Sequence, residues 1–135
     1  MYKNILVPII FDESRNSEEA LKIAERVLEE GGKITALHVI EEVPSYAATY
    51  IDESRIRQAR TEVEAALATK LGDHKNISSR VVTGHPGRTI LEVAEDMGAD
   101  LIVIASHRPG LQDYFLGSTA ARVVRHAPCG VHVIR

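Results

Sequence analysis

The fold is decided by residues 100–124, which read DLIVIASHRPGLQDYFLGSTAARVV. Residues 101–105 form an unbroken apolar run rich in branched side chains, which predicts a strand buried on both faces. Residues 106–110 are mostly polar and predict a turn, and a segment with apolar residues at helical spacing begins at Ser118. The stretch therefore predicts a buried strand, a loop that contains glycine, and a helix.

Gly117, Ser118 and Thr119 stand where that helix is expected to begin. A helix N-terminus offers backbone N–H groups and about half a positive charge to an anion. Gly117 has no side chain and lets a phosphate approach closely, while the hydroxyls of Ser118 and Thr119 are able to donate to phosphate oxygens. The other interpretation is a capped helix after an ordinary loop, because Ser and Thr are favoured caps. The spacing alone leaves both interpretations open.

The composition is that of one globular domain. The chain has 135 residues, of which 44% are hydrophobic and 26% charged, and its net charge is -3. This charge argues against a general binder of nucleic acid or of anionic membranes, and no apolar run approaches the ~20 residues that span a bilayer. Met1-Tyr2-Lys3-Asn4 leads directly into a predicted strand, so we expect no signal peptide and a cytoplasmic protein. Cys129 is the only cysteine, which excludes an intrachain disulfide and predicts a small apolar residue near the last strand.

The rest of the chain alternates apolar runs with segments of helical periodicity. Asn16 and Glu19 form a capping-box pattern at one helix start, Gly31-Gly32 marks the predicted end of that helix, and Pro86 suits another first turn. Residues 41–52 are the least regular part, and whether they line a pocket, cover a partner surface or only connect two elements stays open. The predicted strands are residues 4–10, 33–40, 77–82, 101–105 and 131–134, and the predicted helices start at 16, 53, 86 and 118.

This alternation predicts a single α/β domain over residues 1–135. Strands that alternate with helices form an open parallel sheet with right-handed crossovers and helices on both faces. Ligands of such sheets bind beyond the carboxyl ends of the strands, at the topological switch point. If the first and fourth strands flank that point, Pro8–Asp12 faces Ala105–Ser118 across one crevice.

With this order of elements, the chain resembles the universal stress protein family over essentially all of its length. The resemblance is strongest at residues 5–8 (ILVP), 104–109 (IASHRP), 116–118 (LGS) and 123–135 (VVRHAPCGVHVIR). It implies a five-stranded, adenine-nucleotide-hydrolase-like (Rossmann-like) sheet of order 3-2-1-4-5, and a homodimer or higher assembly through the last strand, Val131–Ile134. Family members divide into ATP binders and non-binders, so the resemblance implies a regulatory stress-response protein that binds ATP, with or without Mg²⁺.

The loop after the fourth strand departs from the pattern of the ATP binders, which is G-x2-G-x9-G-[ST]. Ala105 stands at the first glycine and Arg108 at the second, the loop to Gly117 is one residue shorter, and Gly110 supplies a glycine elsewhere. The Ser-His-Arg-Pro form of this loop resembles a subgroup that includes ATP binders. Nucleotide binding therefore remains the prediction.

Ile10 is a second departure, because many ATP binders carry Asp two residues after the proline of the first strand. The nearest acids here are Asp12 and Glu13. Either Asp12 replaces the missing carboxylate near the ribose and base, or Ile10 offers only its backbone and an apolar contact. Both alternatives stay open.

The resemblance assigns adenine, ribose and phosphate contacts to three parts of the chain, with the Val39 backbone at the base edge. Without a nucleotide, the same residues are strand-end core residues, turn residues and helix caps. The remaining histidines lack metal-ligand spacing and are predicted to be structural or at the surface, and no metal site is predicted. The predicted nucleotide-binding residues are Pro8, Ile9, Ile10, Asp12, Val39, Ala105, Ser106, His107, Arg108, Gly110, Gly117, Ser118 and Thr119.

An enzyme is the second class of function that we consider. The pattern G-x4-G-K-[ST] is absent, so no lysine is held on the β- and γ-phosphates, and only Arg108 and, in its protonated form, His107 supply positive charge nearby. At most slow ATP hydrolysis or phosphoryl transfer is expected.

A phospho-acceptor receiver domain would need Asp after the third strand and Lys after the fifth, where this chain has Thr83-Gly84 and Arg135. An interaction module of the same fold that binds no nucleotide is the other alternative.

Overall fold

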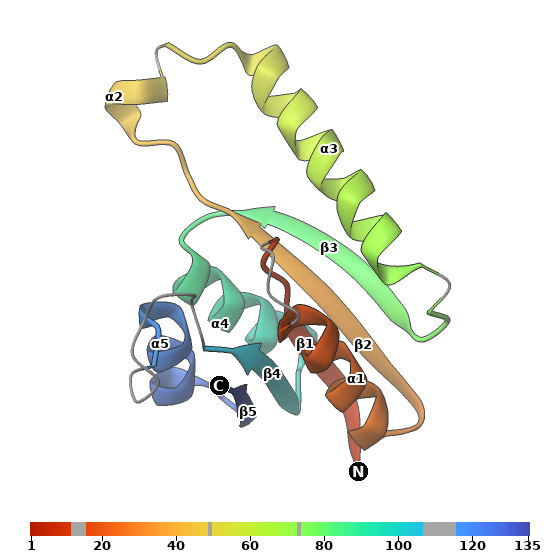
Figure 1. Ribbon diagram of the computed structural model, residues 1–135. Helices are drawn as coiled ribbons and strands as arrows, with labels where there is room; N and C mark the ends of the chain where they lie inside the picture. Colours follow the sequence, from red (N-terminus) through yellow and green to blue (C-terminus); the bar gives the residue numbers. More distant parts are fainter. Residues whose placement is uncertain (12–15, 49, 73, 107–115) are drawn as a thin grey trace.

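Five parallel strands form one open sheet in the order β3-β2-β1-β4-β5, which confirms the predicted fold class (Figure 1). The structure is a computed structural model that describes residues 1–11, 16–48, 50–72, 74–106 and 116–135, apart from the side chains of residues 16 and 48. The strands are β1 (Tyr2–Pro8), β2 (Leu28–Ile40), β3 (Ile77–Thr83), β4 (Leu101–Ala105) and β5 (Gly130–Ile134).

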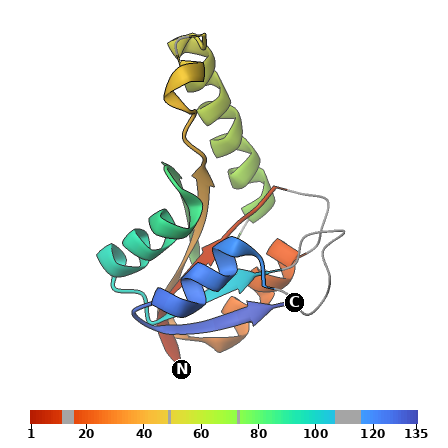
Figure 2. The same ribbon diagram turned by 90° about the vertical axis from the view of Figure 1, so that its left-hand side faces the viewer.

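Helices cover both faces of this sheet, as Figures 1 and 2 show. α1 and α3 pack on one face, and α4 and α5 pack on the other. The short α2 and the first turns of α3 project beyond the end of the sheet (Figure 2). None of the helices in the described ranges is both long and apolar enough to cross a membrane. The helices are α1 (Asn16–Val27), α2 (Ser45–Ala48), α3 (Glu53–Leu71), α4 (Pro86–Met97) and α5 (Ser118–His126).

The core has two halves because successive side chains of a strand point to opposite faces. In β1, Ile5 and Val7 face α1 and α3, whereas Leu6 faces α4 and α5. All three side chains are fully buried. The apolar runs of β1 and β4 therefore bury both of their faces, which is the reason that these strands lie in the middle of the sheet.

The predicted end of the first helix at Gly31-Gly32 is wrong. α1 ends at Val27, and both glycines lie within β2 as the structure assigns it. The pairing of β1 with β2 jumps there from Tyr2↔Leu28 to Asn4↔Lys33, so the chain bulges out of the ladder. Gly31 has φ +82, a conformation that glycine adopts readily, and this glycine serves the bulge rather than a helix end.

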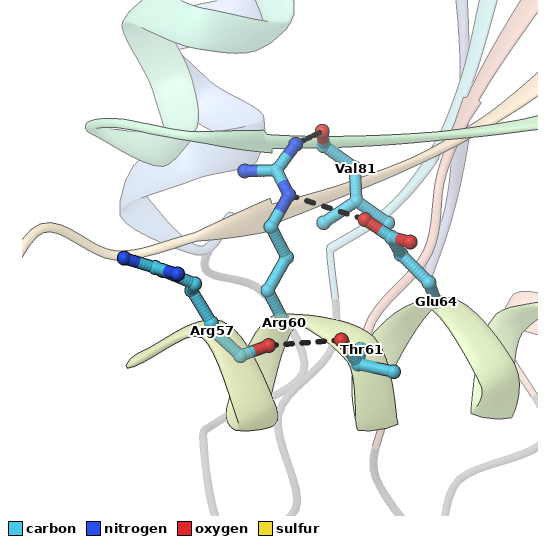
Figure 3. Close-up of polar contacts among 5 residues, drawn as sticks. All are labelled: Arg57, Arg60, Thr61, Glu64 and Val81. Carbon is cyan, nitrogen blue, oxygen red and sulfur yellow. Dashed lines mark hydrogen bonds and ion pairs between the residues drawn. The ribbon is translucent and has the colours of Figure 1, made fainter. Parts of the chain in front are cut away.

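The β3 edge of the sheet is covered by a side chain from α3 (Figure 3). Arg60 donates from its guanidinium to the Val81 carbonyl oxygen at 2.7 Å, and its Nε donates to a Glu64 carboxylate oxygen at 3.1 Å. Thr61 donates its hydroxyl to the Arg57 carbonyl on the same helix (Figure 3). An open edge strand invites pairing with another strand, and a charged side chain that occupies its carbonyl opposes this.

Cys129 lies half-buried at the edge of the α4 and α5 half of the core. Burial raises the pKa of the Cys129 thiol, and the nearby Asp100 carboxylate raises it further. The thiol therefore stays protonated at neutral pH and packs as a small, weakly polar group.

Candidate functional site

The switch point of the sheet lies between β1 and β4. These strands are neighbours, with Ile5 opposite Leu101, although the chain connects β1 to β2 on the other side. A pocket of about 370 Å³ opens at the carboxyl ends of the strands, which is within the range of about 300–1,000 Å³ that ligand pockets occupy. We call it the apolar pocket. Of the predicted site residues, its lining includes Pro8, Ile9, Ile10, Val39, Ala105 and Thr119.

The rim of the apolar pocket is the segment that follows β1, and four hydrogen bonds hold it. Ile9 donates its N–H to the Leu37 carbonyl oxygen at 2.7 Å, and its own carbonyl lies 2.8 Å from Nδ1 of His38. Ser17, buried in the first turn of α1, places its hydroxyl 3.3 Å from Ile10 N and 3.2 Å from Ile10 O. Ile9 is consequently buried, whereas Ile10 remains 51% exposed.

The Val39 backbone forms part of the wall between β2 and the end of β1. Backbone N–H and C=O groups of successive strand residues point alternately to the two neighbouring strands. Ile40 O accepts from Gly84 N on the β3 side, and Leu37 O accepts from Ile9 N on the β1 side. Val39 therefore directs its N–H and C=O to the β1 side, beyond the point where the pairing of β1 ends at Pro8.

A second pocket of about 520 Å³ adjoins the first and shares Glu41, Pro86 and Thr119 with it. We call it the polar pocket. Arg122 of α5 and His85, the N-cap residue of α4, are its cationic or potentially cationic side chains, and Glu41 and Glu42 are acidic. Its remaining lining residues are Gly84, Ser118 and Thr119.

Gly117 is the N-cap of α5, with φ -61 and ψ 155, and no side-chain cap bond is present there. Of the two interpretations of Ser118, the one that makes it the helix cap does not hold, because Ser118 is the first residue inside the helix. Ala121 N makes the first intrahelical bond, to Gly117 O at 2.9 Å. The N–H groups of residues 118–120 thus have no acceptor within the helix, and they are the groups that a bound anion would use.

Ser106 is a predicted site residue whose hydroxyl is engaged elsewhere. Its Oγ and its N–H both donate to the Ile134 carbonyl oxygen, at 3.2 and 2.9 Å, and its side chain is buried. The Ser106 carbonyl instead lies next to Gly117, where a Cβ would come within 3.1 Å of it. Ser106 therefore ties the end of β4 to β5. The predicted contact residues Asp12, His107, Arg108 and Gly110 lie outside the described residues.

The profile of one protein family matches residues 1–135, that of the universal stress protein family. The chain belongs to the universal stress protein family. Universal stress protein G of Escherichia coli O157:H7 is 32% identical to it, and the match covers 100% of both chains. A universal stress protein from Thermus aquaticus is 30% identical, again over 100% of both. The family predicted from the sequence is confirmed.

Solved structures show the same fold for this universal stress protein. The hypothetical protein MJ0577 superposes with a TM-score of 0.79 at 28% identity, over 99% of this chain and 96% of that one. Universal stress protein UspA from Lactobacillus plantarum gives a TM-score of 0.68 at 28% identity, over 99% and 98% of the two chains. A universal stress protein solved in complex with cAMP gives 0.62 at 25% identity, over 99% and 97%.

The sequence did not point to several residues that line the site of this universal stress protein. His38 and His85 were predicted to be structural or at the surface, and Pro86 was predicted only to start a helix. Their common signal was available in the sequence, since each lies at or just beyond the carboxyl end of a strand, where ligands of such sheets bind. Further lining residues that the sequence did not indicate are Ser17, Val63, Ile90 and Arg122.

Proposed function

We propose that this universal stress protein binds adenine nucleotides, ATP among them, and acts as a nucleotide-binding regulatory protein of the stress response. The base would lie in the apolar pocket, and the phosphates would point toward the polar pocket. The observation that carries the proposal is the Val39 backbone, which directs one donor and one acceptor into the apolar pocket. A related protein of the family has been solved with cAMP, an adenine nucleotide.

The Val39 backbone matches adenine and mismatches guanine. The base edge of adenine has an acceptor, N1, beside a donor, the N6 amino group, and these complement a backbone N–H and C=O. Guanine presents the reverse order, a donor at N1 and an acceptor at O6, so two like groups would face each other. A site built to hydrogen-bond one ligand rejects another that leaves its polar groups unpaired.

The walls of the apolar pocket suit a flat, weakly polar ring. Ile9, Ile90 and Ile104 are each at most 3% exposed, and each contributes to the lining. Burying a base against such side chains removes apolar surface from water, which stabilises the complex by roughly 25 cal/mol per Å². The walls supply affinity for any base, and the Val39 edge supplies the choice among bases.

The phosphates would reach the start of α5. Residues 118–120 offer N–H groups without intrahelical acceptors, and Arg122 lies one turn further along the helix at the polar pocket. The described residues contain no group of three His, Cys, Asp or Glu side chains suited to a metal. A magnesium ion that accompanied ATP would take phosphate oxygens and water as ligands, since Mg²⁺ retains several waters in most sites.

Thermal unfolding in the presence of ATP, ADP and GTP tests the proposal. A ligand that binds only the folded state stabilises it by about 2.7 kcal/mol at a concentration of 100 times its Kd. We expect ATP and ADP to raise Tm, and GTP at the same concentration to leave it nearly unchanged. Equal and negligible shifts for all three at millimolar concentration would overturn the proposal.

We also propose that two copies pair through their β5 strands. β3 has its Val81 carbonyl occupied by Arg60, whereas β5 is the other edge of the sheet and carries no such contact among the described residues. Ile134 O points toward β4, where Ser106 binds it, so the alternating Val131 and Val133 direct their backbone groups outward. An isologous pairing would satisfy the outward backbone groups of β5 in both copies.

The mass in solution tests this pairing. Light scattering at tens of micromolar should give a dimer or a larger mass, and Val133→Pro, which removes an outward N–H, should give a monomer.

A further inference from the structure

The ladder between β1 and β2 stops one rung before the position that its register predicts next. Ile9 N donates to Leu37 O at 2.7 Å, as the ladder requires. In a continuing parallel ladder, the Ile9 carbonyl would next accept from Val39 N–H, two residues after Leu37. That backbone bond is not formed in the described part of the chain. The Ile9 carbonyl is instead 2.8 Å from Nδ1 of His38.

The imidazole of His38 must donate in this contact, because a carbonyl oxygen only accepts hydrogen bonds. Nδ1 therefore carries a hydrogen, and in the neutral ring Nε2 has the lone pair. The Phe11 ring packs against the imidazole with centroids 4.7 Å apart and an angle of 55° between the ring planes. Phe11 and the Ile9 carbonyl together fix the orientation of the His38 ring at the wall of the apolar pocket.

We infer that His38 is a positioning residue that keeps the Val39 amide available to a ligand. A carbonyl oxygen has two lone pairs, so the ring does not fill its whole acceptor capacity; the bond from Nδ1 instead holds the Ile9 carbonyl toward the imidazole and so competes with the Val39 N–H for the orientation of that carbonyl. The donor then faces the pocket, where water takes it in the free protein and adenine N1 takes it in the complex. The part of this inference that concerns adenine rests on the proposed function, and the part that concerns the ladder does not.

The segment after β1 is compatible with a closed ladder, and this is why the side chain matters. Ile9 is already held to β2 through its own N–H, and Ile10 is held by the Ser17 hydroxyl on α1. The chain thus leaves the sheet only after residue 9, so the Ile9 carbonyl stays beside β2. Without a competing donor, this carbonyl has Val39 N–H as its nearest backbone partner along the ladder.

Two substitutions separate the hydrogen bond of His38 from its packing. His38→Phe keeps an aromatic ring against Phe11 but has no donor for the Ile9 carbonyl. His38→Asn loses the ring but places an amide N–H₂ at the branch point that Nδ1 occupies. If the donor is what matters, Asn should behave like the parent protein and Phe should not.

Amide hydrogen exchange of the protein without nucleotide tests the ladder directly. We expect Val39 to exchange fast in the parent protein and in His38→Asn, and at least tenfold more slowly in His38→Phe, where the rung closes. The amides of Ile5 and Leu6 in the same sheet are the internal control for an intact fold. Slow exchange of Val39 in the parent protein, or equal rates in the parent and in an intact His38→Phe, would overturn the inference. If His38→Phe does not fold, the parent rate alone still decides against the inference when it is slow, and for it when it is fast and ATP slows it.

Calorimetric titration with ATP and GTP connects the ladder to binding. We expect His38→Phe to weaken ATP binding at least tenfold and to reduce the preference for ATP over GTP, and His38→Asn to stay within threefold of the parent. An unchanged ATP affinity in His38→Phe, with the rung closed, would overturn the assignment of the Val39 amide to adenine. If the parent protein binds no ATP but its Val39 exchange follows the expected pattern, the proposed function falls and the role of His38 in the ladder stands.

Discussion

The two pockets at the carboxyl end of the sheet share three lining residues and otherwise differ in kind. The apolar pocket is walled by buried side chains such as Ile9, Ile90 and Ile104, and its polar groups include backbone. The polar pocket is lined by exposed charged side chains, among them Arg122 and Glu42. Hydrogen bonds between buried groups are strong and discriminating, whereas interactions between exposed charges are screened by water and salt.

This difference assigns separate tasks to the two pockets in the proposed complex. The apolar pocket would choose the base, because a mismatched base leaves buried polar groups unpaired. The polar pocket would respond to the number of phosphates, with a modest contribution from each charge. Adenosine would contact the apolar pocket alone and ATP would contact both pockets. The ratio of their affinities therefore measures how much the polar pocket contributes to binding.

The largest effect is expected from Gly117→Val, which would remove most of the phosphate contribution. Gly117 has φ -61, so a side chain there causes no backbone strain, but its Cβ would lie 3.1 Å from the Ser106 carbonyl oxygen and the remaining carbons would fill the space at the start of α5. We expect the Kd for ATP to rise at least about thirtyfold, or about 2 kcal/mol, with little change for adenosine. Gly117→Ala, which adds the Cβ alone, is the matched control. Parent-like ATP binding by a folded Gly117→Val would place the phosphates elsewhere.

Arg122→Ala should have the next largest effect, and again on ATP alone. The side chain of Arg122 is exposed, so we expect a three- to tenfold loss of ATP affinity, about 0.7–1.4 kcal/mol. Gly87→Ala refines the test, because its Cβ would come within 2.8 Å of Cδ of Arg122 and displace the side chain while the charge remains. A loss smaller than that of Arg122→Ala should result. An equal loss of adenosine affinity in Arg122→Ala would contradict the division between the pockets.

Ile10→Asp acts at the rim of the apolar pocket and should strengthen binding. Ile10 lines this pocket and is 51% exposed, so a carboxylate there would reach the ribose hydroxyls at a moderate desolvation cost. We expect ATP and adenosine to bind up to tenfold more tightly, or by about 1.4 kcal/mol at most. If Asp12 already supplies the carboxylate, Ile10→Asp should weaken binding by repulsion and Asp12→Ala should be the damaging change. Calorimetric titration of both variants decides, and unchanged affinity in both would show that neither position touches the nucleotide.

The smallest effect is expected from Glu42→Gln at the polar pocket. Removing a negative charge near the phosphates should improve ATP binding by about twofold to threefold, or about 0.4–0.7 kcal/mol, and should leave adenosine unchanged. Because Glu42 is exposed, the gain should shrink as salt is added. A gain that is the same for adenosine, or that salt does not reduce, would argue against an electrostatic role.

The fold could be predicted from the sequence because its signals are local. The apolar runs that include Ile5–Val7 and residues 101–105 identified the two central strands, and the helical spacings identified the covering helices. Gly31-Gly32 led to a wrong prediction, because glycine is common both at helix ends and at strand bulges. The bulge depends on how β2 pairs with β1, and no local pattern contains that register.

On its own, the sequence established the order of the elements, because periodicity and turn residues act over a few neighbours, and it predicted the end of the sheet at which a ligand is expected. The three-dimensional arrangement was needed to show which polar groups are engaged. Ser106 donates its hydroxyl to the Ile134 carbonyl oxygen, far away in the chain. His38 donates from its ring to the carbonyl oxygen of Ile9, the residue that follows the neighbouring strand β1. Whether a backbone or hydroxyl group is free for a ligand depends on the partners that tertiary contacts bring to it, and residue identity alone does not carry this information.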